Sequence, residues 1–234
     1  MHIHTPAEIE QVAWEGMLEP LGETFKSPLQ PRVTLGQPAW WPAAEAMEGE
    51  TGKTWTPPTG DRHYTLVRLA CTLHPPDEPR ARYTEATLTA YLRPRAAGAG
   101  AVVAHDLYPR RLTAEGTRTL KIGLGPDLKF AEALEVSLLE VGAEIEMPRA
   151  FPVVQGYGLG ESRPYWRFAH HAGHPLAGCQ SVYAVVDAPA AANGVRLAVE
   201  LVATLETRYG PVRLGLPQEA AAHVSRVIGG AQSQ

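Results

Sequence analysis

The sequence brings three histidines close together, and imidazole is the commonest metal ligand among protein side chains. His170, His171 and His174 form the pattern HHxxH. Three neutral imidazoles can hold a catalytic zinc ion and leave one position open for water. Adjacent residues of a strand face opposite sides, however, so His170 and His171 cannot easily share an ion there. We therefore expect no cofactor, and we keep a zinc-dependent hydrolase built on these histidines as an alternative.

Two further motifs lack the context that their chemistry needs. Residues 49–54, GETGKT, resemble the end of a phosphate-binding loop, but the full motif needs glycine at position 47, where Met47 stands. Pro57 and Pro58 follow, so no helix can begin there to cradle a phosphate. Cys179 would need a nearby histidine base to act as a nucleophile, and a cysteine just before a buried strand is more often a small core residue. The sequence thus favours a protein that is not an enzyme.

Glycines alternate with larger residues in the stretch 156–160, GYGLG. The spacing differs from a dinucleotide-binding fingerprint, because the later glycine is missing and no helical pattern follows. Glycine most often serves backbone conformation, which favours a turn or bulge that lets two backbones approach each other. The alternative is a flexible binding loop whose tip carries Glu161, Ser162 and Arg163.

Aromatic and arginine side chains follow the glycines. Trp166 and Phe168 share one face of a strand by their spacing, and Tyr165 and Arg167 share the other. Large aromatic residues dominate β-sheet cores, which predicts that the first two point inward. Tyrosine and arginine are enriched at interface hot spots, which predicts that the other two point outward as anchors. The candidate binding residues are therefore Tyr157, Glu161, Arg163, Tyr165 and Arg167.

Alternation of apolar and polar residues predicts the strands that position these side chains. Within 65–73 the odd positions from 67 to 73 are apolar, and within 83–92 the even positions from 86 to 92 are apolar, as in strands with one face in water. Turn-forming residues at 74–79 predict that these strands form a hairpin. Residues 195–209 carry the longest alternation. Their leucines also fall four residues apart, as in a helix, but the alternation favours a strand.

Shorter patterns predict further strands at 101–107, 118–124 and 181–186. Within 134–145 the apolar positions change from even to odd. A change of face within one strand requires a bulge or a break, and Gly142 lies close to it.

Helices are expected only near the two ends of the chain. A capping-box pattern predicts a helix over roughly 6–15, and Pro217 with the apolar face that follows predicts a C-terminal helix over 217–229. Residues 20–60 hold seven prolines and three tryptophans. We expect an irregular segment there, packed on the body by its indoles.

The order of these elements sets the fold class. Strands do not alternate with helices, which argues against βαβ folds. We expect a single all-β domain over residues 1–234, mainly antiparallel, with a β-sandwich or jelly-roll-like body and short N- and C-terminal helices.

Composition limits the partners and the compartment. The net charge of −4 carries no basic excess, so we expect no nucleic-acid partner. No run of about 18 apolar residues exists, so we expect no membrane span. The N-terminus lacks the pattern of a secretory signal, which predicts a cytoplasmic protein. Alanine and arginine are abundant, as in proteins of GC-rich bacterial genomes. The two cysteines, Cys71 and Cys179, do not form a disulfide framework.

These observations favour recognition over catalysis. Long alternating strands and an aromatic, glycine-rich loop suit surface binding. We expect a non-enzymatic interaction module that self-assembles into a homo-oligomer or docks into a larger protein complex. The alternatives are the metal-dependent hydrolase described above and a carbohydrate-binding sandwich that uses Trp40, Trp41 and Trp55 as stacking platforms.

Overall fold

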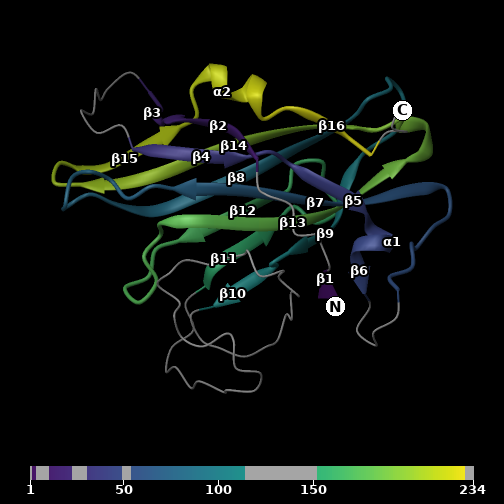
Figure 1. Cartoon of the computed structure of the whole chain (residues 1–234), viewed down its shortest axis with the longest axis horizontal. Coiled ribbons are helices and arrows are strands. Elements are labelled where there is room, and N and C mark those ends of the chain that lie inside the picture. The colour runs from purple at the N-terminus through teal and green to yellow at the C-terminus, as the bar shows by residue number, and fades with distance from the viewer. Residues whose placement is uncertain (1, 4–10, 23–30, 49–53, 114–151, 230–234) are drawn as a thin grey trace.

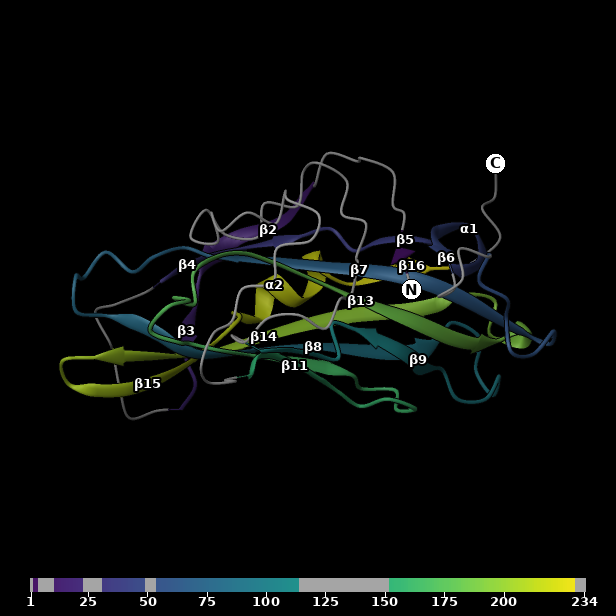
Figure 2. The same cartoon turned by 90° about the horizontal axis from the view of Figure 1, so that it is seen from below.

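Two antiparallel β-sheets make up most of the computed structural model, which describes residues 2–3, 11–22, 31–48, 54–113 and 152–229. The strands run roughly along the long axis of the molecule (Figure 1), and the view turned by 90° shows the two sheets as stacked layers (Figure 2). Every pairing between the described strands is antiparallel. The fold is therefore an all-β sandwich, as the sequence predicts.

The larger sheet has eight strands. In order across the sheet they are β10 (Arg111–Thr113), β11 (Pro152–Tyr157), β12 (Tyr165–Ala169), β8 (Arg82–Pro94), β14 (Val195–Thr207), β15 (Gly210–Gly215) and β3 (Glu19–Pro20), with β16 (Arg226–Ile228) also pairing with β14. Its two central strands, β8 and β14, have 13 residues each, and they pair along almost their whole length.

The smaller sheet has six strands. In order they are β2 (Val12–Met17), β4 (Arg32–Gly36), β7 (Arg62–Leu73), β13 (Gly178–Pro189) and β9 (Val103–Tyr108), with β5 (Ala39–Pro42) also pairing with β7.

Short elements complete the described part of the chain. They are the strand pair β1 (His2–Ile3) and β6 (Met47–Glu48), the helices α1 (Ala43–Ala46) and α2 (Gln218–His223), and a 3-10 turn at Ala190–Ala192. No helix among the described residues is long and apolar enough to cross a membrane.

The main hydrophobic core lies between the two sheets. Leu197, Leu201 and Leu205 point into it from β14, whose odd positions are buried while its even positions keep some exposure. β12 adds Trp166, which is 0% exposed, and Phe168, which is 1% exposed. These findings confirm the strand predicted at 195–209 and the inward orientation of both aromatic side chains.

A second hydrophobic cluster covers part of the smaller sheet on the side away from the main core. Leu66 of β7 and Met47 of β6 are two of its buried members. Trp41 and Trp55 pack against this cluster, and Trp40 packs against the main core. The indoles therefore anchor their segment to the body, as predicted. The segment is nevertheless more regular than expected, because its described part contains β4, β5, α1 and β6.

The strands predicted at 65–73 and 83–92 both form, but the hairpin between them is wrong. β7 pairs with β13, β4 and β5 in the smaller sheet, whereas β8 pairs with β14 and β12 in the larger one. Residues 74–81 therefore connect the two layers. The alternation in each strand reports which side faces the core, and it carries no information about which strand lies alongside.

Both terminal helices also differ from their predictions. Val12–Met17 is a strand paired with β4, so the helix predicted over 6–15 is wrong in its last residues, and 6–10 lie outside the described residues. The C-terminal helix predicted over 217–229 is shorter, because α2 ends at His223 and Arg226–Ile228 forms β16. Pairing of β16 with β14 buries Ile228 completely.

The remaining strand predictions divide into two groups. β9 and β13 correspond to the strands predicted at 101–107 and 181–186. The predictions for 118–124 and 134–145 lie outside the described residues.

Candidate interaction surface

The outer face of the larger sheet carries two tyrosines that stack on each other. Tyr157 and Tyr165 are register partners on β11 and β12. Their ring centroids lie 4.9 Å apart at an interplanar angle of 18°. The Tyr157 hydroxyl also donates a hydrogen bond of 2.8 Å to Oε1 of Gln155 on its own strand. The stack thus presents an aromatic surface to solvent. Both tyrosines are among the candidate binding residues predicted from the sequence.

Arg167 extends this surface toward β8. Its Nη2 atom lies 2.5 Å from Oε2 of Glu85, and both side chains keep about half to a third of their surface in water. An exposed ion pair of this kind contributes little to stability. Its effect is to orient the guanidinium group, and the outward position of Arg167 agrees with the prediction.

Arg163, two residues before Tyr165, contacts side chains of β8 and β14. Its guanidinium carbon lies 4.9 Å from the ring centroid of Tyr91, and its Nη2 atom lies 3.8 Å from Oε2 of Glu200. The Tyr91 hydroxyl donates to the same carboxylate oxygen at 2.5 Å. Burial, followed by this hydrogen bond, raises the pKa of Tyr91 above its ordinary value. Arg163 of the loop between β11 and β12, Tyr91 of β8 and Glu200 of β14 therefore contact one another.

The glycine-rich loop between β11 and β12 is tied to both sheets. The Gly160 amide donates to the Ala104 carbonyl on β9 at 2.8 Å, and the Ala104 amide donates to the Glu161 carbonyl at 2.9 Å. The Leu92 amide on β8 donates to the Ser162 carbonyl at 2.9 Å. These bonds occupy part of the exposed edge of β9, which would otherwise be free to pair with another strand. The turn that brings backbones together, predicted from the glycines, is therefore confirmed.

The side chains of Glu161 and Arg163 remain exposed on this loop. Whether they, or Tyr157, Tyr165 and Arg167, contact a ligand stays a prediction. Backbone hydrogen bonds hold the loop that carries Glu161 and Arg163. The alternative predicted from the sequence was a flexible loop.

The three histidines lie in the connection from β12 to β13. The His171 amide donates to the His174 carbonyl at 3.1 Å, the His174 amide donates back at 2.9 Å, and the two rings lie 5.9 Å apart. His170 is held separately, because its amide donates to the Thr84 carbonyl at 3.0 Å. Burial, then the charges of Arg82 and His171, lower the pKa of His170 from its ordinary value.

No group of three or more histidine, cysteine, aspartate or glutamate side chains within the described ranges could hold a metal ion. The structure thus gives no support to a zinc site at His170, His171 and His174, and that alternative stays a prediction. Of the other motifs, Cys179 is half-buried opposite Thr72 of β7, and most of the loop-like stretch 49–54 lies outside the described residues.

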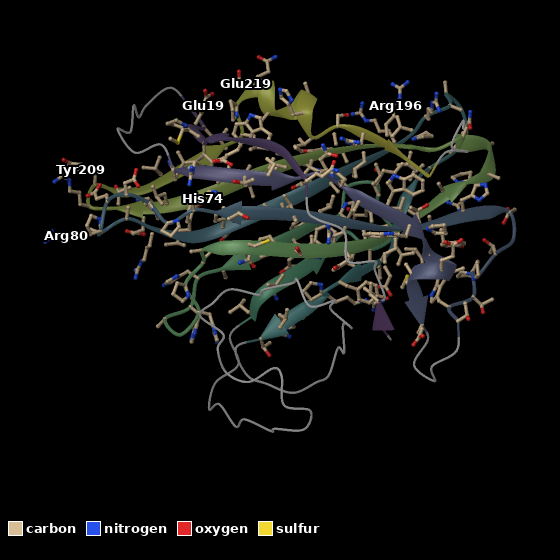
Figure 3. All side chains as sticks on the ribbon, viewed as in Figure 1. Glu19, His74, Arg80, Arg196, Tyr209 and Glu219 are labelled. Atoms are coloured by element: carbon tan, nitrogen blue, oxygen red, sulfur yellow. The ribbon has the colours of Figure 1, made fainter. Side chains whose placement is uncertain are left out.

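An open hollow lies elsewhere, at the edge near α2. Glu19, Pro217, Gln218 and Glu219 line it, and Figure 3 labels the two glutamates there. None of the residues selected from the sequence lines this hollow.

Sequence reasoning missed the partners on β8 and β14, namely Glu85, Tyr91 and Glu200. All three occupy outward positions of alternating strands, which is a signal that the sequence does contain. The missing information was that β8 lies between β12 and β14, since this arrangement brings them beside Arg163 and Arg167.

Fold and surface together define an antiparallel β-sandwich with a preorganised aromatic and arginine-rich outer face. No protein-family model and no curated protein sequence matches the chain. Among solved structures, the chain is similar to the C-terminal domain of the AgI/II polypeptide BspA of Streptococcus agalactiae, with a TM-score of 0.31 and 12% identity. That match covers 79% of this chain and 49% of the other, so this chain spans about half the length of that protein.

A second similar structure is the NetB toxin of Clostridium perfringens in its membrane-inserted form. The TM-score is 0.33 and the identity 7%, over 94% of this chain and 99% of the toxin. Likenesses this weak say nothing about the function of this chain.

Proposed function

We propose that this chain is a non-enzymatic interaction module that docks into a larger protein complex or self-associates through the outer face of the larger sheet. The stacked pair Tyr157 and Tyr165 is the observation that carries the proposal. Tyrosine and arginine are the residue types enriched at interface hot spots, and Arg163 and Arg167 lie two residues before and two residues after Tyr165. An exposed sheet face that combines them suits a protein partner better than a small molecule, which needs a concave pocket.

The two arginines of this face already have intramolecular partners that favour one arrangement of their side chains. Glu85 orients Arg167, and Tyr91 with Glu200 orients Arg163. Immobilising a flexible side chain at an interface costs about 0.5–1.5 kcal/mol, so prior ordering removes part of the cost of binding. The stacked tyrosines offer contact area to a partner, and their mutual contact reduces the cost of immobilising them on binding.

Native mass spectrometry of the untagged protein, purified without chelator, tests the proposal. We expect masses that are multiples of the 25.3 kDa chain, or one chain with a bound protein, and no metal-sized increment. A chain that stays monomeric at all concentrations and retains no protein from its native lysate would contradict the proposal. A monomer that carries zinc would instead favour the hydrolase alternative.

The two alternatives gain no specific support. Trp40, Trp41 and Trp55 all pack against hydrophobic clusters, which leaves less of each indole for stacking on a sugar. The histidines are discussed above. The cytoplasmic location and the single-domain organisation stay predictions.

A further inference from the structure

Two arginines lie side by side on the outer face of the larger sheet, and a third follows just past the end of β8. Arg93 of β8 and Arg196 of β14 are direct register partners, and both are exposed. Arg95 follows two residues after Arg93, and its amide donates to the Gly194 carbonyl at 3.0 Å, beside the start of β14. Figure 3 shows Arg196 toward one end of the sandwich, far from Arg80 at the other end. We call Arg93, Arg95 and Arg196 the arginine cluster.

The arginine cluster differs from Arg163 and Arg167 in having no carboxylate partner among the described residues. Arg163 and Arg167 lie within 4.0 Å of Glu200 and Glu85. Within the described part of the chain, no such ion pair forms with any member of the cluster. Glu200 lies four residues from Arg196 along β14, and it already contacts Tyr91 and Arg163.

The neighbours of the arginine cluster do not offset its charge either. Arg196 has Arg93 on one side and Val227 of β16, which is 48% exposed, on the other. Like charges placed directly opposite each other on adjacent strands are destabilising. The described residues supply no negative charge to offset the repulsion between Arg93 and Arg196. An anion bound between these two side chains would offset it.

We propose that the arginine cluster binds the carboxylates of an acidic, extended protein segment. Guanidinium groups form paired, charge-assisted hydrogen bonds with carboxylates. Arg93 and Arg196 lie directly opposite each other on neighbouring strands about 4.7–4.9 Å apart, and Arg95 follows just past the end of β8. Arginines at these positions can engage several carboxylates of an extended acidic partner that crosses this end of the sheet. Exposed Val227 adds apolar contact at one edge. This proposal rests on the proposed function and names the chemistry of the partner.

Fluorescence anisotropy with a labelled, acetylated peptide of alternating glutamate and serine tests the proposal, with a glutamine and serine peptide as the neutral control. The proteins are the intact chain and its Arg196→Gln, Arg93→Gln and Arg80→Gln variants. Arg80 is also exposed, so its variant loses the same charge at the opposite end. We expect each of the two cluster variants to weaken glutamate-peptide binding about tenfold, and Arg80→Gln to change it less than twofold.

Three results would overturn the proposal. The first is equal binding of the two peptides, and the second is an equal loss in Arg80→Gln and Arg196→Gln. The third is tighter binding of an oligothymidylate than of the peptide, which would indicate a nucleic-acid surface. Melting temperature serves as the folding control, because loss of one member of a like-charged pair does not lower it. If the peptide fails to bind while protein assembly persists, the acidic partner is wrong and the proposed function stands.

Discussion

Replacement of Trp166 by alanine is expected to lower the free energy of unfolding by about 3–5 kcal/mol. The indole is 0% exposed in the core between the sheets. It lies on β12 between its register partners Leu88 on β8 and Gly156 on β11, so truncation removes contacts on both sides. The rigid backbone pairing of β12 prevents the neighbours from collapsing into the space, and the cavity therefore adds to the lost burial.

Urea denaturation, followed by circular dichroism, measures this effect. Tyr165→Ala is the matched control, because it truncates the adjacent residue on the opposite face of the same strand. We expect about 1 kcal/mol there, which is the contribution of a stacked aromatic pair. Equal losses in the two variants would show that the two faces of β12 are not divided into core and surface as described.

Gly158→Ala is expected to cost at least about 2 kcal/mol of unfolding free energy. Gly158 has φ of +85°, a left-handed conformation that costs other residues about 1–2 kcal/mol. A Cβ atom there would also lie 2.9 Å from the carbonyl oxygen of Arg163 and 2.9 Å from Cα of Pro164. Both contacts are with backbone, so the loop between β11 and β12 must shift to accept the methyl group.

Gly160→Ala separates these two causes. Gly160 has φ of +78°, but nothing lies within 4 Å of the position its Cβ would take. We expect that variant to lose only the conformational term of about 1–2 kcal/mol. If thermal or urea melts show Gly158→Ala to be no worse than Gly160→Ala, the close backbone approach is not a constraint on the fold.

For the long strands, the sequence was sufficient to predict that they form and which side of each faces the core. Alternation is a local property, and it places Trp166 inward and Arg167 outward whatever the neighbouring strand is. The same reasoning gave the correct choice for Val195–Thr207, where leucines four residues apart also matched a helix. Face and element type are therefore accessible from the pattern when the strand is long.

Strand partners were not accessible, and this is where the predictions failed. Residues 74–79 have the composition of a turn, but the same composition serves a connection between two layers, and β7 and β8 end in different sheets. Val12 and Ile228 had helical spacing, yet pairing with β4 and β14 made both segments strands. Distant pairing outweighs weak local preferences of short segments.

The candidate surface shows the same division. Tyr165 and Arg167 were selected from residue type and parity, and the structure places both on the outer face. Glu200 and Arg196 were not selected, because their relation to Arg163 and Arg93 arises only when β14 lies beside β8. Those contacts depend on residues more than 30 positions apart, and a single sequence does not specify them.

If the protein assembles through the outer face of the larger sheet, truncation of a tyrosine on that face must weaken assembly, whereas truncation of an exposed tyrosine elsewhere must not. Tyr165→Ala removes one ring of the stacked pair. Tyr209→Ala removes a more exposed ring, 63% accessible, from the turn between β14 and β15 at the end of the sandwich shown in Figure 3.

The measurement is the dissociation constant of the assembly, by sedimentation equilibrium for copies of the chain or by calorimetry for a different partner. Tyr165→Ala is expected to raise this constant about 30-fold, which corresponds to a hot-spot loss of about 2 kcal/mol. Tyr209→Ala is expected to leave it within twofold. Assembly that weakens with Tyr209→Ala and is unaffected by Tyr165→Ala would contradict the account and place the interface at the end of the sandwich.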